Sequence, residues 1–289
     1  MKMPRTRGIF LWSALLSRTI YIMILFFLFL AGLSVGSFLN AVICRMESGE
    51  SALKGRSHCM SCAHELAWHD LIPLVSFFVL RGRCRYCNAR ISFQYPLVEF
   101  AAGLLFAFLF VAHASFPAFL YSAAIFSLLL VIFVYDLKHF LIPDSAVFSA
   151  IAIAFLWRIF EFLKFDIWNL FGIWNLEFGI SLPFVQALFS AIAASLFFFA
   201  IYAVSRGGAM GFGDVKLAFF MGLFLGWPNI LVGLFLAFSM GAFVGISLVF
   251  LRKKQFSSEV PFAPFLILGT FIAFLWGNSV AQWYLKFLY

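Results

Sequence analysis

Residues 100–135 have the sequence FAAGLLFAFLFVAHASFPAFLYSAAIFSLLLVIFVY, which contains no Asp, Glu, Lys or Arg over 36 positions. A helix needs about 20 apolar residues to cross the roughly 30 Å of hydrocarbon in a bilayer. The stretch is too long for one crossing, and His113 and Ser115-Phe116-Pro117 interrupt it near its middle. It therefore predicts two membrane-spanning helices joined by a tight turn, and it assigns the chain to the all-α polytopic membrane proteins.

The composition of the whole sequence supports this class. Of the 289 residues, 64% are apolar, 20% are aromatic and 11% are charged, whereas soluble domains are about half apolar and about a quarter charged. This balance excludes a large soluble catalytic domain. A formal net charge of +8 would suit a nucleic-acid-binding protein, but the charges fall mostly between apolar runs, as topology determinants do. We therefore expect the lipid bilayer as a partner, and no nucleic acid.

Further apolar runs bring the expected number of transmembrane helices to about eight. Residues 19–44 carry no charge and follow a basic N-terminal segment, but no small-residue cleavage site comes after them. We interpret them as a retained helix rather than a signal peptide. Single spans are expected at about 145–163, at 184–205 and from near residue 261. Residues 217–251 form another charge-free block, which Gly226-Trp227-Pro228-Asn229 divides into two spans.

The longest polar segment, residues 45–95, holds seven Lys or Arg. The sequence thus predicts three parts: an N-terminal segment with the first transmembrane helix (1–44), a small cytoplasmic module (45–95) and a membrane-embedded domain of about seven helices (96–289). Alternate sides of an eight-helix arrangement carry 13 and 7 Lys or Arg, and the positive-inside rule places the side with the polar segment in the cytoplasm. Residues 164–183, rich in Trp, Asn, Phe and Gly, are interpreted as aromatic anchoring at the membrane surface.

Four of the five cysteines form two Cys-x-x-Cys pairs in the polar segment, Cys59 with Cys62 and Cys84 with Cys87. Each pair can direct two thiolates at one ion, and four thiolates fill the tetrahedral shell of Zn²⁺ without leaving a position for a substrate. The spacing therefore predicts a structural zinc ion that supplies much of the module's folding free energy. Free thiols and two disulfides are the alternatives, although a reducing cytoplasm disfavours disulfides. The fifth, Cys44, is interpreted as a small buried apolar residue.

Two aspartates, Asp136 and Asp214, border predicted spans. Asp136 directly follows an apolar run, and Asp214 ends the sequence Gly211-Phe212-Gly213-Asp214 directly before another. Two spans separate them, and an even number of crossings returns the chain to the same membrane face. Carboxyl groups near membrane depth are energetically costly and usually mark function, pairing or an aqueous cavity. The placement therefore predicts that the two carboxyl groups can meet.

Two carboxyl groups that share a site do not both ionise easily, so one keeps a proton while the other is charged. Such a pair can activate a water molecule and polarise an amide carbonyl, and neither residue is given a fixed role. We expect Gly211 and Gly213 to let an extended peptide approach. The alternative is that both aspartates merely cap helices at the interface. Asp144 is interpreted as a helix N-cap, and Glu99 as an interface residue or the partner of a loop arginine.

The order of several motifs resembles that of type IV prepilin peptidases. These motifs are Gly36-Ser37-Phe38-Leu39-Asn40, the two Cys-x-x-Cys pairs, Tyr95-Pro96-Leu97-Val98-Glu99, Asp136-Leu137 with Ile142-Pro143-Asp144, and Gly211-Phe212-Gly213-Asp214-Val215-Lys216. The resemblance implies an eight-helix GxGD-type aspartic protease with Asp136 and Asp214 as catalytic residues and the four cysteines as zinc ligands. Such enzymes remove the short basic leader of type IV prepilin or pseudopilin precursors at the cytoplasmic face of the bacterial inner membrane. They commonly then methylate the new N-terminus with S-adenosylmethionine.

Two other classes of protein remain open at this point. A non-enzymatic transporter or assembly scaffold with a zinc-stabilised cytoplasmic loop would use the same charges as ion-pathway or capping groups. For a transporter, the two aspartates could lie on opposite membrane faces, which an aspartic protease does not allow. A pure methyltransferase would keep its activity without either aspartate.

Overall fold

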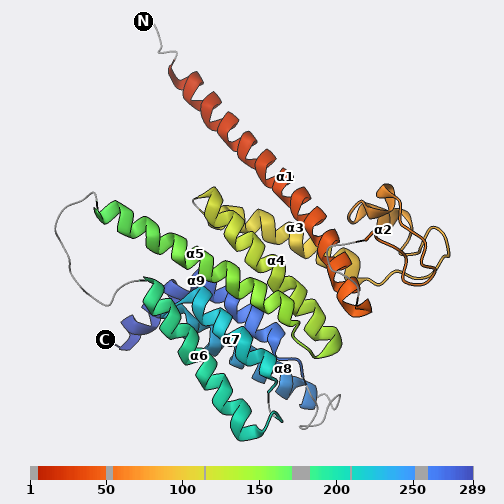
Figure 1. The fold of residues 1–289 in the computed structure, drawn as a ribbon. Coiled ribbons are helices and arrows are strands. Elements are labelled where there is room, and N and C mark those ends of the chain that lie inside the picture. Colours follow the sequence, from red (N-terminus) through yellow and green to blue (C-terminus); the bar gives the residue numbers. More distant parts are fainter. Residues whose placement is uncertain are drawn as a thin grey trace, which may run out of the picture. The chain divides into compact units, whose positions relative to one another are not determined.

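The computed structural model describes residues 6–49, 55–113, 115–170, 183–208, 210–250 and 260–288. Within these ranges every regular element is a helix, and the only strand-like features are two isolated bridges in the polar segment. The chain divides into two compact units, Met1–Ser127 and Leu128–Tyr289 (Figure 1). The prediction of an all-α protein is confirmed.

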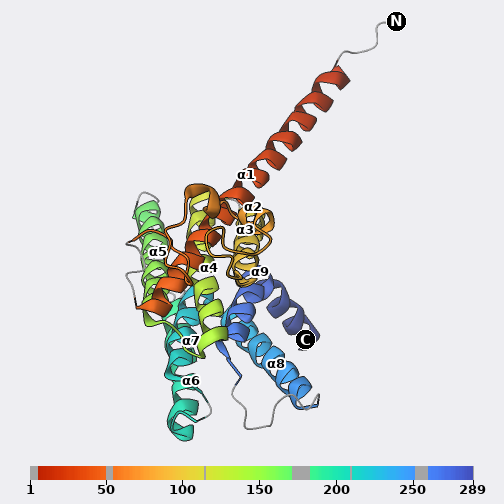
Figure 2. The ribbon, with the colours of Figure 1, turned by 90° about the vertical axis from the view of Figure 1, so that its right-hand side faces the viewer.

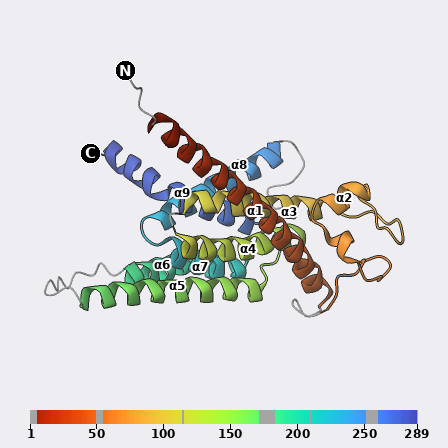
Figure 3. The same cartoon turned by 90° about the horizontal axis from the view of Figure 1, so that it is seen from above.

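The first unit contains α1 (Thr6–Ser48), the 3-10 helix η1 (Trp68–Leu71), α2 (Val75–Val79), α3 (Gln94–Ala112) and the beginning of α4 (Phe116–His139). The helices α1 and α3 pack against each other (Figure 3). Their backbones come closest near Gly36, where a Cβ atom would lie 2.6 Å from Glu99 Cα. Small residues of this kind allow close helix pairs in membranes, where van der Waals packing drives association.

The second unit contains the rest of α4, then α5 (Asp144–Leu170), α6 (Pro183–Ser205), α7 (Phe212–Leu225), α8 (Asn229–Phe250) and α9 (Ala263–Leu288). The central helix is α7, which contacts α5, α6, α8 and α9 (Figure 2). Most of its residues are buried, among them Leu217, Phe220 and Leu223. At Gly222 a Cβ atom would lie 2.4 Å from Ala191 Cα of α6, so only glycine allows this approach.

Among the described residues, seven helices are long and apolar enough to cross a membrane, and they lie in α1, α3, α4, α5, α6, α8 and α9. The chain is therefore a multi-pass membrane protein. The remaining predicted span corresponds to α7, which has 14 residues and a length of about 21 Å. This is shorter than the roughly 30 Å of bilayer hydrocarbon. This predicted span is thus a short helix surrounded by other helices.

Proline and glycine fix several helix ends. Pro117 lies in the first turn of α4, where its missing N–H leaves no intrahelical hydrogen bond unmade. Pro143 directly precedes α5, and its carbonyl accepts the backbone N–H groups of Ala146 and Val147. Gly226 ends α7 with a φ of 68°, a left-handed conformation that glycine adopts without strain.

The polar segment is slightly shorter than predicted, because helix α1 continues to Ser48 and α3 already begins at Gln94. The division of the chain into three consecutive parts, 1–44, 45–95 and 96–289, stays a prediction. The predicted aromatic anchor at 164–183 lies mostly outside the described residues, although α5 extends to Leu170.

Candidate active site and candidate metal centre

The second unit contains both predicted catalytic aspartates. Asp136 lies in the last turn of α4 and Asp214 in the first turn of α7. Both residues are buried, with exposed fractions of 4% and 8%, and their carboxyl groups are near enough to interact electrostatically. The structure thus brings together two residues that are far apart in the sequence, and it does not place them at opposite ends of the unit, as a transporter could.

Each of these carboxyl groups also faces the N-terminus of a helix. The backbone N–H of Ala263, the first residue of α9, donates to the carboxyl group of Asp136. The N–H of Gly211, the N-cap of α7, donates to that of Asp214. Helix N-termini present unpaired N–H groups and the positive end of the helix dipole. They can therefore stabilise negative charge on a buried oxygen.

Helix capping alone does not account for this arrangement. Oδ2 of Asp136 is buried and has no hydrogen-bond partner among the described residues. Leaving a buried polar atom unpaired costs about 1–3 kcal/mol, and the second carboxyl group nearby adds repulsion whenever both are charged. Two aspartates that served only as caps would be more stable apart. An arrangement that costs stability but offers a free acceptor is typical of a functional site.

The two glycines beside Asp214 have different surroundings. A Cβ atom on Gly213 would lie 2.9 Å from Ile142 Cβ, whereas one on Gly211 would meet nothing nearer than Asp214 Oδ2 at 3.8 Å. Gly213 therefore lets the loop after α4 pack against α7. The expectation that both glycines leave room for a peptide is wrong for Gly213, because the protein itself fills that space. For Gly211 it stays a prediction.

Asp144 joins the first turns of two helices. It is the first residue of α5, and its Oδ1 accepts a hydrogen bond of 2.6 Å from Lys216 Nζ in α7. The same Nζ lies 5.2 Å from the ring centroid of Phe212, at a distance typical of cation–π contacts. Asp144 thus pairs with Lys216, whereas its N-cap role stays a prediction. Sequence reasoning did not single out Lys216, although it is the only cation in the motif that ends with it.

Arg158 of α5 binds the other end of α7. Its Nε donates to the carbonyl of Leu223 at 3.1 Å, and its Nη2 donates to that of Phe224 at 2.8 Å. The last carbonyls of a helix lack intrahelical donors and carry the negative end of the dipole. Arg158 therefore stabilises the helix that carries Asp214. In the sequence it was recognisable only as a charge near the end of the predicted span 145–163.

The first unit brings the four predicted zinc ligands together. The Sγ atoms of Cys59, Cys62, Cys84 and Cys87 all lie within 4.8 Å of one another, and those of Cys59 and Cys87 are 3.8 Å apart. A tetrahedral zinc ion with bonds of about 2.3 Å separates its sulfur ligands by about 3.8 Å, so the donor set and its spacing fit zinc. All four are free thiols, which disagrees with the alternative of two disulfides.

The two cysteine loops share a backbone pattern. The N–H of Ala63 donates to the carbonyl of Cys59, and the N–H of Asn88 donates to that of Cys84. Ala63 and Asn88 both have positive φ, at 56° and 60°. The same turn is thus built twice, and each copy directs two thiols towards a common point. The shared Cys-x-x-Cys spacing was the only sign of this repeat in the sequence.

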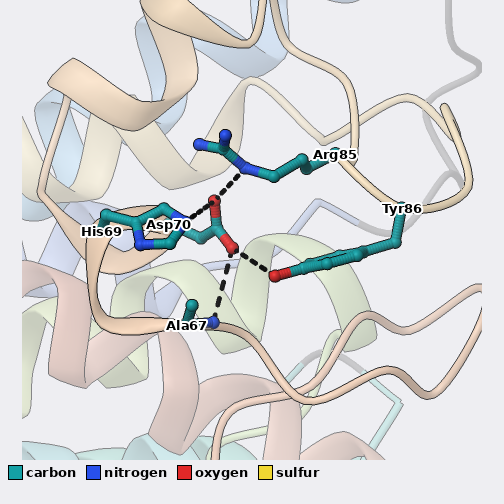
Figure 4. A network of polar contacts seen from close by, with 5 residues as sticks. All are labelled: Ala67, His69, Asp70, Arg85 and Tyr86. Carbon is teal, nitrogen blue, oxygen red and sulfur yellow. Dashed lines mark hydrogen bonds and ion pairs between the residues drawn. The ribbon is translucent and has the colours of Figure 1, made fainter.

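One buried carboxylate links η1 to the second cysteine loop. Asp70 accepts hydrogen bonds from Arg85 Nε at 2.7 Å, Tyr86 Oη at 3.1 Å and the N–H of Ala67 at 3.4 Å (Figure 4). Burial raises the pKa of Asp70, but the hydrogen bonds from Arg85 and Tyr86 outweigh it and hold that pKa below its usual value. Asp70 was missed by sequence reasoning. A single Asp in a segment with several arginines is nevertheless a signal for an ion pair.

Two further residues take part in polar contacts, one between α3 and the polar segment and one between α1 and α3. The carboxylate of Glu99 accepts a hydrogen bond of 2.8 Å from the N–H of Leu74, so its partner is a backbone amide rather than the expected arginine. Cys44 Sγ lies 2.8 Å from Tyr95 Oη. The interpretation of Cys44 as a purely apolar residue is therefore wrong, because a hydroxyl group comes within hydrogen-bonding distance of it.

Two interacting buried carboxyl groups in a multi-pass helical protein are the arrangement that a membrane-embedded hydrolytic enzyme of the aspartic class needs. The comparison with known families agrees with this class. A family described as "Bacterial Peptidase A24 N-terminal domain" matches residues 30–113, and the "Type IV leader peptidase family" matches residues 123–246. The chain belongs to the type IV leader peptidase family, and it is a peptidase.

Several relatives carry the name "Prepilin leader peptidase/N-methyltransferase". The one from Aeromonas hydrophila is 33% identical over 285 residues, which cover 89% of this chain and 92% of the relative. The one from Bacillus subtilis is 31% identical over 260 residues, covering 90% and 97%. The one from Myxococcus xanthus is 37% identical over 229 residues, covering 76% and 62%. No solved structure matches the chain.

Proposed function

We propose that the chain is an aspartic endopeptidase with Asp136 and Asp214 as its catalytic pair. Its substrates are type IV prepilin or pseudopilin precursors, from which it removes the basic leader at the cytoplasmic face of the bacterial inner membrane. One observation carries the proposal: two buried carboxyl groups from helices far apart in the sequence interact in one place. The relatives' names support the substrate class, and the distribution of Lys and Arg supports the orientation.

The paired carboxyl groups supply both functions that peptide hydrolysis needs. One carboxylate takes a proton from a water molecule, whose oxygen then attacks the scissile carbonyl carbon, while the protonated partner donates to the carbonyl oxygen. Collapse of the tetrahedral intermediate breaks the C–N bond, and the leaving nitrogen takes up a proton. The free Oδ2 of Asp136 is an acceptor for that water. The helix N-termini of α7 and α9 stabilise whichever carboxyl group is charged.

We further propose methyl transfer to the new N-terminus, as the relatives' names suggest. S-Adenosylmethionine would supply the methyl group. The amine exposed by cleavage is the acceptor, so peptide hydrolysis precedes this step.

Zinc is the proposed metal of the four-cysteine cluster. Cys59, Cys62, Cys84 and Cys87 would hold it, and four thiolates leave it a structural role. The ion would lock the two cysteine loops against each other, with Asp70 orienting the second loop through its contacts to Arg85 and Tyr86.

The test of the peptidase is cleavage of a precursor with a basic leader by purified enzyme in detergent, followed by gel shift. Asp136→Asn and Asp214→Asn should each lower the cleavage rate by about 10²- to 10⁴-fold or more, because each removes one half of the acid–base pair. Glu161→Gln is the matched control: it removes a carboxylate of the same unit that faces Arg158, and it should keep its activity. Cleavage by Asp214→Asn at the rate of the unmodified enzyme would refute the mechanism.

A further inference from the structure

Three large apolar side chains form an exposed edge of the polar segment. Phe78, Val79 and Phe93, hereafter the apolar edge, have exposed fractions of 67%, 70% and 66%. The ring of Phe77 holds two of them together, since its centroid lies 5.9 Å from those of both Phe78 and Phe93. Exposed apolar residues that gather in this way usually mark a contact with a partner or a membrane.

The apolar edge lies next to the start of a membrane span. Phe93 directly precedes α3, whose candidate span begins at Gln94. The N–H of Leu74, the N-cap of α2, is bonded to Glu99, five residues into that span and so about 7.5 Å along its axis. The short helix α2 is therefore held beside the first turns of α3, where the candidate membrane span begins.

Basic residues adjoin the apolar edge. Arg81 follows α2 closely, and Arg83 and Arg90 form an antiparallel bridge, which places two like charges opposite each other. All three residues are exposed. Like charges directly opposite on neighbouring strands repel each other, so an anion between them would relieve this cost. Anionic head groups attract basic residues at a membrane surface by about 1 kcal/mol each.

We propose that the apolar edge inserts into the bilayer around α3 and that Arg81, Arg83 and Arg90 bind the phosphates of anionic lipids there. The occupant is the lipid surface, because the hydrogen bond to Glu99 fixes the edge beside the start of a candidate membrane span and the charges complement anionic lipid. Apolar side chains next to Arg are typical of segments that lie in the membrane interface. The contact would hold the cysteine loops against the membrane, and it does not depend on the proposed peptidase mechanism.

The first test places a fluorine probe on the apolar edge of the full chain in nanodiscs. Trifluoromethylphenylalanine is incorporated at position 78 or, as a control, at position 60, where Met60 is an exposed residue of the first cysteine loop. We expect a nitroxide on the lipid chain near the head group to broaden the position-78 signal but not the position-60 signal. A water-soluble nitroxide should do the opposite. The proposal would be overturned if only the water-soluble nitroxide broadened the position-78 signal. It would also be overturned if this signal were protected from the water-soluble nitroxide only after a pilin precursor is added.

The second test measures how the chain retains phosphatidylglycerol in native mass spectrometry. Arg83→Gln and Arg90→Gln should each weaken its retention about fivefold, as expected for the loss of about 1 kcal/mol, and should leave phosphatidylcholine unaffected. Arg56→Gln, which removes the same charge from an exposed ion pair with Glu65, should have little effect. Equal losses in all three variants would show a general effect of net charge and contradict a lipid site at the bridge. Metal content, measured in parallel, reports whether the cysteine loops remain folded.

Discussion

Asp136 and Asp214 each accept a backbone hydrogen bond from the N-terminus of a different helix. Each carboxyl group is thus supported by its own helix dipole, while the two still interact with each other. The same pair of contacts explains why a capping interpretation and a catalytic interpretation of these residues were both reasonable. The two interpretations differ in what they say of the second carboxyl oxygen of Asp136, because capping leaves it without a partner.

At the residue scale, Gly213 offers a test of how the site is shaped. Gly213→Ala would place a methyl group 2.9 Å from Ile142 Cβ, and we expect it to cost about 1–3 kcal/mol through overpacking and to lower the cleavage rate by displacing Asp214. Ile142→Gly in the same chain, which also removes the Cβ atom of residue 142, should restore part of both losses. Thermal unfolding in detergent and the precursor gel shift measure them. A double variant no better than Gly213→Ala would show that Ile142 is not the cause.

The sequence was sufficient to predict the aspartate pair, because counting membrane crossings placed both residues on one face. It did not predict the contacts around the pair. Ile142 fills the space beside Gly213, and Arg158 binds the end of α7, but both contacts join segments whose packing does not follow from local pattern. The cysteine ligands were predictable from their spacing, whereas the position of Asp70 depends on how η1 folds back on the second loop.

At the element scale, α7 is a short helix held at both ends. Lys216 near its start pairs with Asp144, and Arg158 binds its last carbonyls. The charge-free run 217–251, divided at Gly226-Trp227-Pro228-Asn229, predicted where this helix ends, but it did not predict that α5, α6, α8 and α9 all contact it. The length follows from the left-handed turn at Gly226.

Arg158→Met should destabilise the protein by about 2–3 kcal/mol, because it leaves the carbonyls of Leu223 and Phe224 without their donor in a buried place. Arg158→Lys, which can reach one carbonyl, should lose less. Thermal unfolding in detergent, with cleavage measured well below the transition, separates lost stability from lost activity. Equal stability of Arg158→Met and the unmodified chain would rule out an anchoring role.

The close pair of α1 and α3 gives a second prediction at this scale. Gly36→Leu should prevent the approach of the two backbones and cost about 1–3 kcal/mol, since even a Cβ atom would lie 2.6 Å from Glu99 Cα. Gly245→Leu is the matched control, because a Cβ atom on Gly245 would meet nothing within 4 Å. If both variants unfold at the same temperature as the unmodified chain, the helices do not depend on glycine for their contact.

On the scale of the whole molecule, the metal cluster lies in the first compact unit and the aspartate pair in the second. Cys84→Ser should remove most of the bound zinc and make residues 49–93 sensitive to protease, because the metal supplies much of the folding free energy of such loops. The helical content, measured by circular dichroism, should change little. Cys44→Ser is the control, and it should keep the metal. Undiminished zinc in Cys84→Ser would contradict the proposed ligand set.

The central claim is that Asp136 and Asp214 meet, and cross-linking tests it most directly. Asp136→Cys and Asp214→Cys are combined in a chain that carries a specific protease site inserted between α5 and α6, and the protein is oxidised in the membrane and then cleaved. The account predicts that the two fragments stay joined until a reductant is added, while a chain with Glu161→Cys and Asp214→Cys, which also carries one cysteine on each fragment, falls apart. Fragments of the first chain that separate without reductant, as those of the control do, would contradict the claim.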